Sequence, residues 1–191
     1  MLLKNLNARL PLKQPRNTRI GVVGSSANDS LVLLGNYHGA PAYDKVVTPL
    51  EAIIGLCGRE HVRYTPGAWV AGEGTWDFTS ALQVANASDV AVVFLGGSAK
   101  GTVAGVTHYD TTEKEGMDRT EIGLPGVQLD LLKALATQTS TPIVVVLING
   151  GTHADFGNTE FSVEGHILSL CAGTIRFSAY WRGALHSQII A

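Results

Sequence analysis

Three short runs of apolar residues stand out along the chain, and each one ends at a glycine. They are Arg19–Gly24, Asp89–Gly96 and Pro142–Gly150. Runs that are this short, nearly unbroken and rich in β-branched residues are typical of strands buried on both faces of a parallel sheet. The pattern therefore predicts that these three segments form the centre of a sheet. Two weaker strand candidates are His61–Tyr64 and Ile167–Leu170.

Helical patterns lie between the predicted strands. The segment Thr48–Leu56 opens with a residue suited to the N-cap and has Pro49 at its first helical position. A second helix is expected over Phe78–Ala87 and a third from about Pro125 to Ala136. The apolar face of the third helix carries Val127, Leu131, Leu132 and Leu135.

Strands that alternate with helices of this length indicate right-handed βαβ units. We therefore predict an α/β fold, a three-layer sandwich in which a mostly parallel sheet is flanked by helices. Ligands of such sheets bind at the loops that follow the carboxyl ends of the strands. Here these loops are Gly24–Ser30, Gly96–Glu121 and Asn149–Phe156, of which the second is unusually long.

Composition narrows the possible partners. The 191 residues are 45% hydrophobic, which is enough for one domain with a sizeable core. Because the net charge is −2 and no run of basic residues could neutralise a phosphate backbone, we expect no nucleic-acid partner. No apolar stretch approaches the roughly 18 residues of a membrane span, so we expect no membrane partner. The six histidines and two cysteines lack metal-ligand spacing, and the sequence predicts neither metal nor cofactor.

An acidic cluster, Glu113–Arg119, stands in the long loop after the second predicted strand. A carboxylate at this edge of a sheet can act as a general acid or base when its surroundings raise its pKa. A solvated charged loop explains the same residues without any chemistry. Retaining glycosidases need two carboxyl groups about 5 Å apart, and neighbours on one loop, such as Glu113 and Asp118, rarely face each other across a sugar ring. The residues alone leave both interpretations open.

Five motifs follow one another along residues 2–170. They are Leu2–Leu12, Ile20–Ala27, Leu34–Glu51, Glu113–Leu131 and Asn149–Gly151. In this order they resemble the C-terminal domain of glycoside hydrolase family 3, particularly its β-xylosidase-like and β-glucosidase-like members. The most specific match is Glu-x-Glu-Gly-x-Asp-Arg followed by Leu-Pro-Gly-x-Gln.

The resemblance implies a role for one residue above all. In the family this domain supplies the general acid/base from the Glu-Gly-x-Asp-Arg loop, which points to Glu115, with Glu113 as the reserve choice. The nucleophilic aspartate belongs to a preceding barrel domain that this sequence does not contain. The implied reaction is the retaining hydrolysis of a β-linked saccharide without a cofactor, and a full-length family member is expected outside the cell.

The resemblance also divides the chain. We expect residues 1–18 to be a lead-in from the barrel domain, residues 19–173 to be the sandwich domain and residues 174–191 to be a tail that resembles nothing in the family. On this interpretation the chain is a fragment of a β-xylosidase or β-glucosidase, inactive or nearly so alone. The alternative is a non-catalytic carbohydrate-binding or interaction module with the same fold. The residues do not decide between xylose and glucose.

Two departures from the family pattern are visible. Gly97–Tyr109 lengthens the acid/base loop by on the order of a dozen residues, and loops of such length are commonly functional or disordered. After Leu170 the family's Trp-Tyr-Pro-Gly and its following helix are replaced by Cys171–Thr174. We therefore expect the sheet to lack its last elements.

Overall fold

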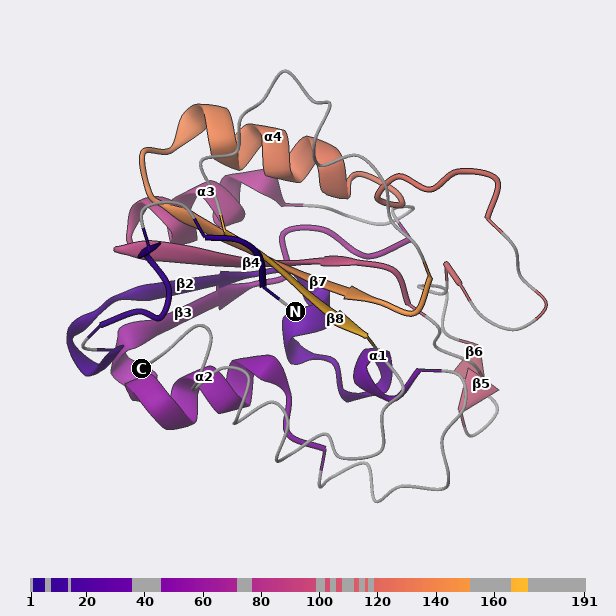
Figure 1. Ribbon diagram of the computed structural model, residues 1–191, viewed down its shortest axis with the longest axis horizontal. Helices are drawn as coiled ribbons and strands as arrows, with labels where there is room; N and C mark the ends of the chain where they lie inside the picture. Colours follow the sequence, from indigo (N-terminus) through magenta and orange to yellow (C-terminus); the bar gives the residue numbers. More distant parts are fainter. Residues whose placement is uncertain are drawn as a thin grey trace.

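The computed structural model describes residues 2–5, 8–13, 15–35, 46–71, 77–98, 102–103, 106–107, 112–113, 116, 119–151 and 166–171. These residues build a six-stranded sheet that is covered by helices on both faces (Figure 1). A separate two-stranded hairpin lies to one side of it (Figure 1). The prediction of an α/β sandwich with a mostly parallel sheet is confirmed.

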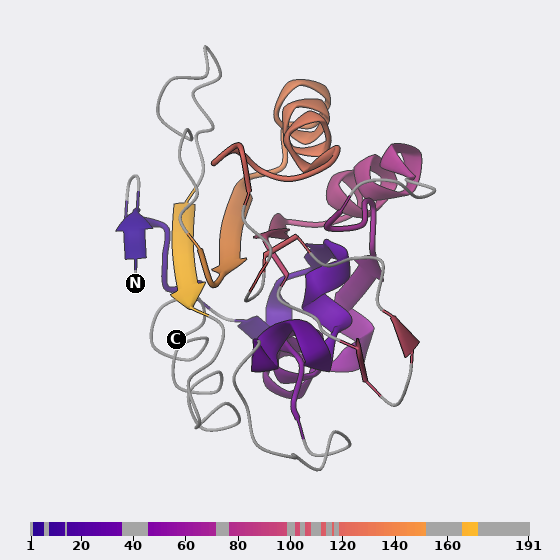
Figure 2. The same ribbon diagram turned by 90° about the vertical axis from the view of Figure 1, so that its right-hand side faces the viewer.

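The sheet has the strand order β1-β8-β7-β4-β2-β3. Its strands are β1 (Leu2–Lys4), β8 (His166–Cys171), β7 (Ile143–Asn149), β4 (Val90–Gly96), β2 (Ile20–Val23) and β3 (Val62–Thr65). All neighbouring strands are parallel except β1 and β8, which pair antiparallel. Figure 2 shows β1 (indigo), β8 (yellow) and β7 (orange) side by side. The three apolar runs form the adjacent strands β2, β4 and β7, as predicted, and the weaker candidates form β3 and β8.

Four α-helices in the described part of the chain flank the sheet. They are α1 (Ser30–Leu34), α2 (Pro49–Cys57), α3 (Phe78–Asn86) and α4 (Gln128–Gln138). The predicted N-terminus of α2 is confirmed, because Thr48 forms a capping box with Glu51 and Pro49 occupies the first turn. Where the chain is described, short 3-10 helices at Pro15–Asn17, Ser25–Asn28 and Arg59–His61 connect the larger elements.

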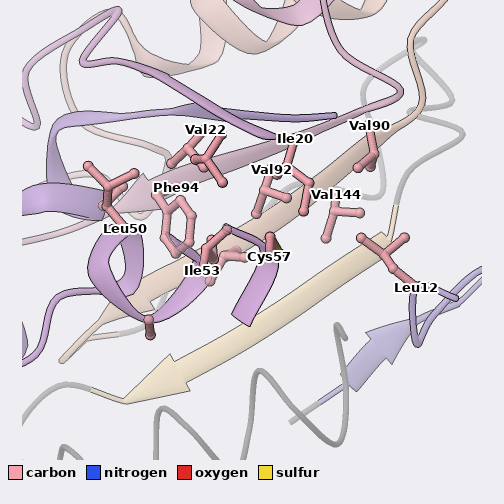
Figure 3. Packing of buried hydrophobic residues seen from close by; sticks show 14 of the residues in the cluster. Leu12, Ile20, Val22, Leu50, Ile53, Cys57, Val90, Val92, Phe94 and Val144 are labelled. Atoms are coloured by element: carbon pink, nitrogen blue, oxygen red, sulfur yellow. The ribbon is translucent and has the colours of Figure 1, made fainter. Parts of the chain in front are cut away.

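Two apolar cores lie on opposite faces of the sheet because successive side chains of a strand point to opposite sides. On one face, Val22 and Phe94 pack with Ile53 of α2, as Figure 3 shows. On the other face, Val93 and Leu131 belong to the cluster that includes α3 and α4. Burial on both faces explains why β2, β4 and β7 read as unbroken apolar runs.

Residues 1–18, which the sequence analysis treats as a lead-in, contribute β1 to the sheet, where Leu2 pairs with Leu168. Of the two cysteines, Cys57 is buried in the core beneath α2, while the side chain of Cys171 lies outside the described part of the structure. No helix within the described ranges is long and apolar enough to cross a membrane. Among the same residues, no group of three or more His, Cys, Asp or Glu side chains is placed to hold a metal ion.

Candidate functional site

The carboxyl ends of β4 and β7 lie side by side, with Gly96 paired to Ile148. A Cβ atom at Gly96 would run into the carbonyl oxygen of Ile148, and Gly96 also has a φ of +134°. Glycine is therefore required here for two independent reasons. One residue further on, the Gly97 N–H donates to the Ile148 carbonyl oxygen at 3.0 Å, so the two segments are still hydrogen-bonded to each other where they leave the sheet.

The side-chain amide of Gln128, the first residue of α4, secures this edge. Its Oε1 accepts from the Gly96 N–H at 2.9 Å, and its Nε2 lies 2.9 Å from the Gly96 carbonyl oxygen. The same nitrogen also donates to the carbonyl oxygens of Val70 and Pro125, at 3.0 and 3.1 Å. Gln128 is 3% exposed, so these bonds are shielded from water. The glutamine of the Leu-Pro-Gly-x-Gln motif thus joins three segments of backbone.

The long loop leaves and re-enters this edge at one point. The Ser98 N–H donates to Thr112 Oγ1 at 2.9 Å, and the Ser98 carbonyl accepts from the N–H groups of Thr112 and Glu113, at 2.8 and 3.0 Å. The ends of residues 99–111 are therefore tied together. Within this insertion, β5 (Thr102–Val103) and β6 (Val106–Thr107) form an antiparallel hairpin (Figure 1).

Glu113 lies buried between the ends of β4 and β7, with 8% of the residue exposed. Its Oε1 accepts a hydrogen bond from the Gly150 N–H at 2.7 Å. Its Oε2 lies 3.5 Å from Nη2 of Arg119, whose own side chain is 16% exposed. Nη1 of Arg119 donates to the carbonyl oxygen of Gly123 at 3.1 Å. The two charged ends of the acidic cluster are therefore joined to each other and to the sheet.

Two glycines make room for this carboxylate. A Cβ atom at Gly97 would overlap the carboxyl group of Glu113, and one at Gly151 would lie 2.8 Å from Oε2. Neither glycine has a positive φ, so backbone conformation does not require glycine at either position. The absence of these side chains leaves the space that the carboxylate fills. This explains why the second glycine of the Asn-Gly-Gly motif, Gly151, is a glycine.

The predicted site residues have different outcomes. Glu115 and Asp118 lie outside the described residues. Gly116, between them, is exposed and has a φ of +74°. Glu113 and Arg119 come together; Glu113 is buried and the side chain of Arg119 is 16% exposed, so neither charged group is fully solvated. The sequence alone assigned no role to Gly97, Gly151 or Gln128. The glycine pair after each of two neighbouring strands was the signal that could have found the two glycines; the buried role of Gln128 left no such signal.

Residues 1–175 of the chain match the sequence model of the glycosyl hydrolase family 3 C-terminal domain. The chain belongs to this family. A probable exo-1,4-beta-xylosidase of Aspergillus aculeatus is 35% identical over 173 residues, which are 88% of this chain and 19% of the relative. Beta-D-xylosidase 3 of Arabidopsis thaliana is 33% identical over 151 residues, or 79% of this chain and 17% of the relative. This family 3 domain thus spans less than a fifth of the length of these relatives.

Solved structures of family 3 enzymes share the fold. An exo-beta-xylosidase in complex with a xylobiose aziridine activity-based probe superposes with a TM-score of 0.73 and 26% identity, covering 97% of this chain and 21% of that chain. A beta-glucosidase of Bifidobacterium adolescentis superposes with a TM-score of 0.65 and 28% identity, covering 87% and 22%. The resemblance to family 3 xylosidases and glucosidases that the motifs indicated is confirmed.

Proposed function

We propose that this family 3 domain is the acid/base half of a retaining β-glycosidase of the xylosidase or glucosidase type, with Glu115 as the general acid/base. The observation that carries the proposal is the ion pair between Glu113 and Arg119 at the carboxyl edge of the sheet. Glu113 and Arg119 flank Glu115 in the sequence, and their position at the edge where ligands of such folds bind supports the assignment.

The proposed chemistry needs a second protein surface. In a retaining mechanism one carboxyl group protonates the departing oxygen while a second attacks the sugar and forms a covalent intermediate. Glu115 would supply the first group and would then remove a proton from the water that hydrolyses the intermediate. We propose that the nucleophile, and most contacts to the sugar, come from a barrel domain that precedes this domain in the full-length enzyme.

The domain alone is therefore expected to have little activity, because most of the groups that stabilise the transition state would be on the partner. The test is hydrolysis of aryl β-xylosides and aryl β-glucosides by the purified chain, alone and mixed with a separately expressed family 3 barrel domain. Turnover in the mixture alone is the expected result. Turnover by the chain alone would overturn the division of the site between two domains.

The role of Glu115 is tested in the same mixture with Glu115→Gln. A general acid matters most when the leaving group is poor, so hydrolysis of xylobiose should fall by about 10²-fold or more while an activated aryl xyloside is affected far less. Glu121→Gln, which removes an exposed carboxylate from the same loop, is the matched control. Full activity of Glu115→Gln on xylobiose would refute the assignment. Binding of xylobiose by the chain, with no turnover in any mixture, would indicate a non-catalytic carbohydrate-binding module instead.

A further inference from the structure

The acidic cluster contains a buried carboxylate that the proposed mechanism does not use. Glu113 is held among residues from three segments, namely Ser98 after β4, Gly150 after β7 and Arg119 at the end of the cluster. The geometry points to Glu113 as a positioning residue, whose carboxylate fixes the loop that carries the acid/base. This inference rests on the proposed role of Glu115.

Because Glu113 is buried, its charge must be compensated by neighbouring groups. A carboxylate removed from water is destabilised unless hydrogen bonds and an opposite charge replace its hydration. Here the Gly150 N–H contacts one oxygen and the Arg119 guanidinium faces the other. The space at Gly97 and Gly151 accepts the carboxyl group without moving the backbone. A site that combines a donor, a counter-charge and two side-chain vacancies is shaped for a carboxylate at this position.

Chain connectivity carries this restraint to Glu115. Glu115 follows Glu113 by two positions in the sequence, and two residues of extended chain span at most about 7 Å, so an anchor at Glu113 restrains this part of the loop. The segment is held a second time at Arg119, four residues further on. Tying both ends reduces the conformations that a short loop can adopt. Because misplacement of a catalytic group by about 1 Å can lower a rate 10²-fold, loss of the anchor should reduce catalysis even though Glu113 does not touch the substrate.

The first measurement needs no activity. Hydrogen exchange of the chain, followed by mass spectrometry, compares Glu113→Ala and Glu113→Gln with the unaltered sequence over residues 112–120 and at the Gly150 amide. Glu113→Ala should speed exchange in both places by about 10-fold or more, because both the hydrogen bond and the ion pair are lost. Glu113→Gln keeps an acceptor for Gly150 and should have a smaller effect. Unchanged exchange in both variants would overturn the anchor.

The second measurement uses steady-state kinetics to test whether Glu113 positions the proposed acid, Glu115. In the mixture with the barrel domain, Glu113→Ala should lower kcat on xylobiose by about 10- to 100-fold, leave KM within about 3-fold and affect an activated aryl xyloside little. Glu113→Gln should restore part of the loss, and Glu121→Gln is the control. Equal losses on both substrates would mean that Glu113 serves only the fold.

The two proposals fail in different ways. If Glu115→Gln selectively loses xylobiose hydrolysis and the Glu113 variants do not, the acid/base assignment stands and the positioning role is wrong. If Glu115→Gln keeps full activity, the proposed function is wrong, and hydrogen exchange still decides whether Glu113 anchors the loop. Should Glu113→Ala not fold, Glu113→Gln takes its place, because its amide has nearly the same shape as the carboxylate but cannot form the ion pair with Arg119. Faster exchange over residues 112–120 is then the expected result, and unchanged exchange would overturn the anchor.

Discussion

The side-chain amide of Gln128 hydrogen-bonds both the N–H and the carbonyl group of Gly96, and so joins the start of α4 to the end of β4. Its replacement by leucine would leave these buried backbone groups without partners. We expect Gln128→Leu to lower the free energy of unfolding by about 2–4 kcal/mol. Urea unfolding measures this change. Gln138→Leu, at the exposed end of the same helix, should change stability by less than about 0.5 kcal/mol, and equal effects of both variants would contradict the role of Gln128.

The space at Gly97 can be tested through its coupling to Glu113. An added methyl group would overlap the carboxyl group, so Gly97→Ala should destabilise the domain by about 1–3 kcal/mol. In a Glu113→Ala background the methyl group meets no carboxylate, and most of this cost should disappear. A double-mutant cycle from urea unfolding gives the coupling energy, expected to exceed about 1 kcal/mol.

Gly55 provides the control for that cycle. It lies on the exposed side of α2, and a Cβ atom there would meet nothing within 4 Å. Gly55→Ala should stabilise the helix by about 0.5–1 kcal/mol and show no coupling to Glu113. If Gly97 and Gly55 behave alike, Gly97 is not reserved for the carboxylate.

The pH dependence of stability should carry a contribution from Asp89. Side-chain hydrogen bonds from Arg19, followed by the bond from its backbone N–H, lower the pKa of Asp89 from 3.8 to about 2. A carboxyl group whose pKa is lower in the folded state stabilises that state above its unfolded pKa, and the contribution is lost as the pH falls. We therefore expect stability to decline between about pH 4 and pH 2, and Asp89→Asn to remove this part of the decline.

The measurement is a series of urea titrations across that pH range, with the Asp89 carboxyl titrated by NMR. Asp130→Asn serves as the control, because its carboxylate lies on an exposed face, 3.8 Å from Lys133 Nζ. An unchanged pH profile in Asp89→Asn would show that the ion pair with Arg19 does not persist in solution.

The thiol of Cys57 should be inert in the folded domain. Cys57 is the last residue of α2, and its burial in the core raises the pKa of its thiol from 9.0 to about 11. At pH 8 the nucleophilic thiolate is therefore scarce, and the sulfur is also inaccessible to reagents. In a Cys171→Ala variant, Ellman's reagent at pH 8 should react only on unfolding, with one thiol titrated in denaturant. Rapid reaction in native buffer would show that the core opens on the time scale of labelling.

The helices and strands that could be predicted from the sequence are those whose own residues determine them. β2, β4 and β7 are apolar because they are buried on both faces, and α2 carries its own cap and proline. β1 is different, since its three residues form a strand only through pairing with β8, more than 160 positions away. The five-residue α1 is too short to show helical periodicity, although Asp29 caps it by accepting from Leu31 and Val32.

The candidate site was also only partly predictable from local sequence. The acidic cluster was found from its motif, but its charged residues are as typical of a solvent-exposed loop as of a general acid or base. Glu113 is buried because Gly97 and Gly151, which lie far apart in the sequence, come together at the ends of adjacent strands. Such a vacancy arises from strand order and register. No local window contains it.

The antiparallel pairing of β1 with β8 has a consequence for the order of folding. Leu2 is synthesised more than 160 residues before its partner Leu168. The neighbouring strands β2, β3 and β4 are complete by residue 96 and can pair while synthesis continues. Until residues 143–149 are made, the buried strand β4 lacks its neighbour β7, and β7 in turn lacks β8 until residue 171 is made. An unpaired edge on an apolar strand is a surface on which aggregation can begin. Nascent domains arrested before residue 166 should therefore depend on chaperones more than the completed chain does.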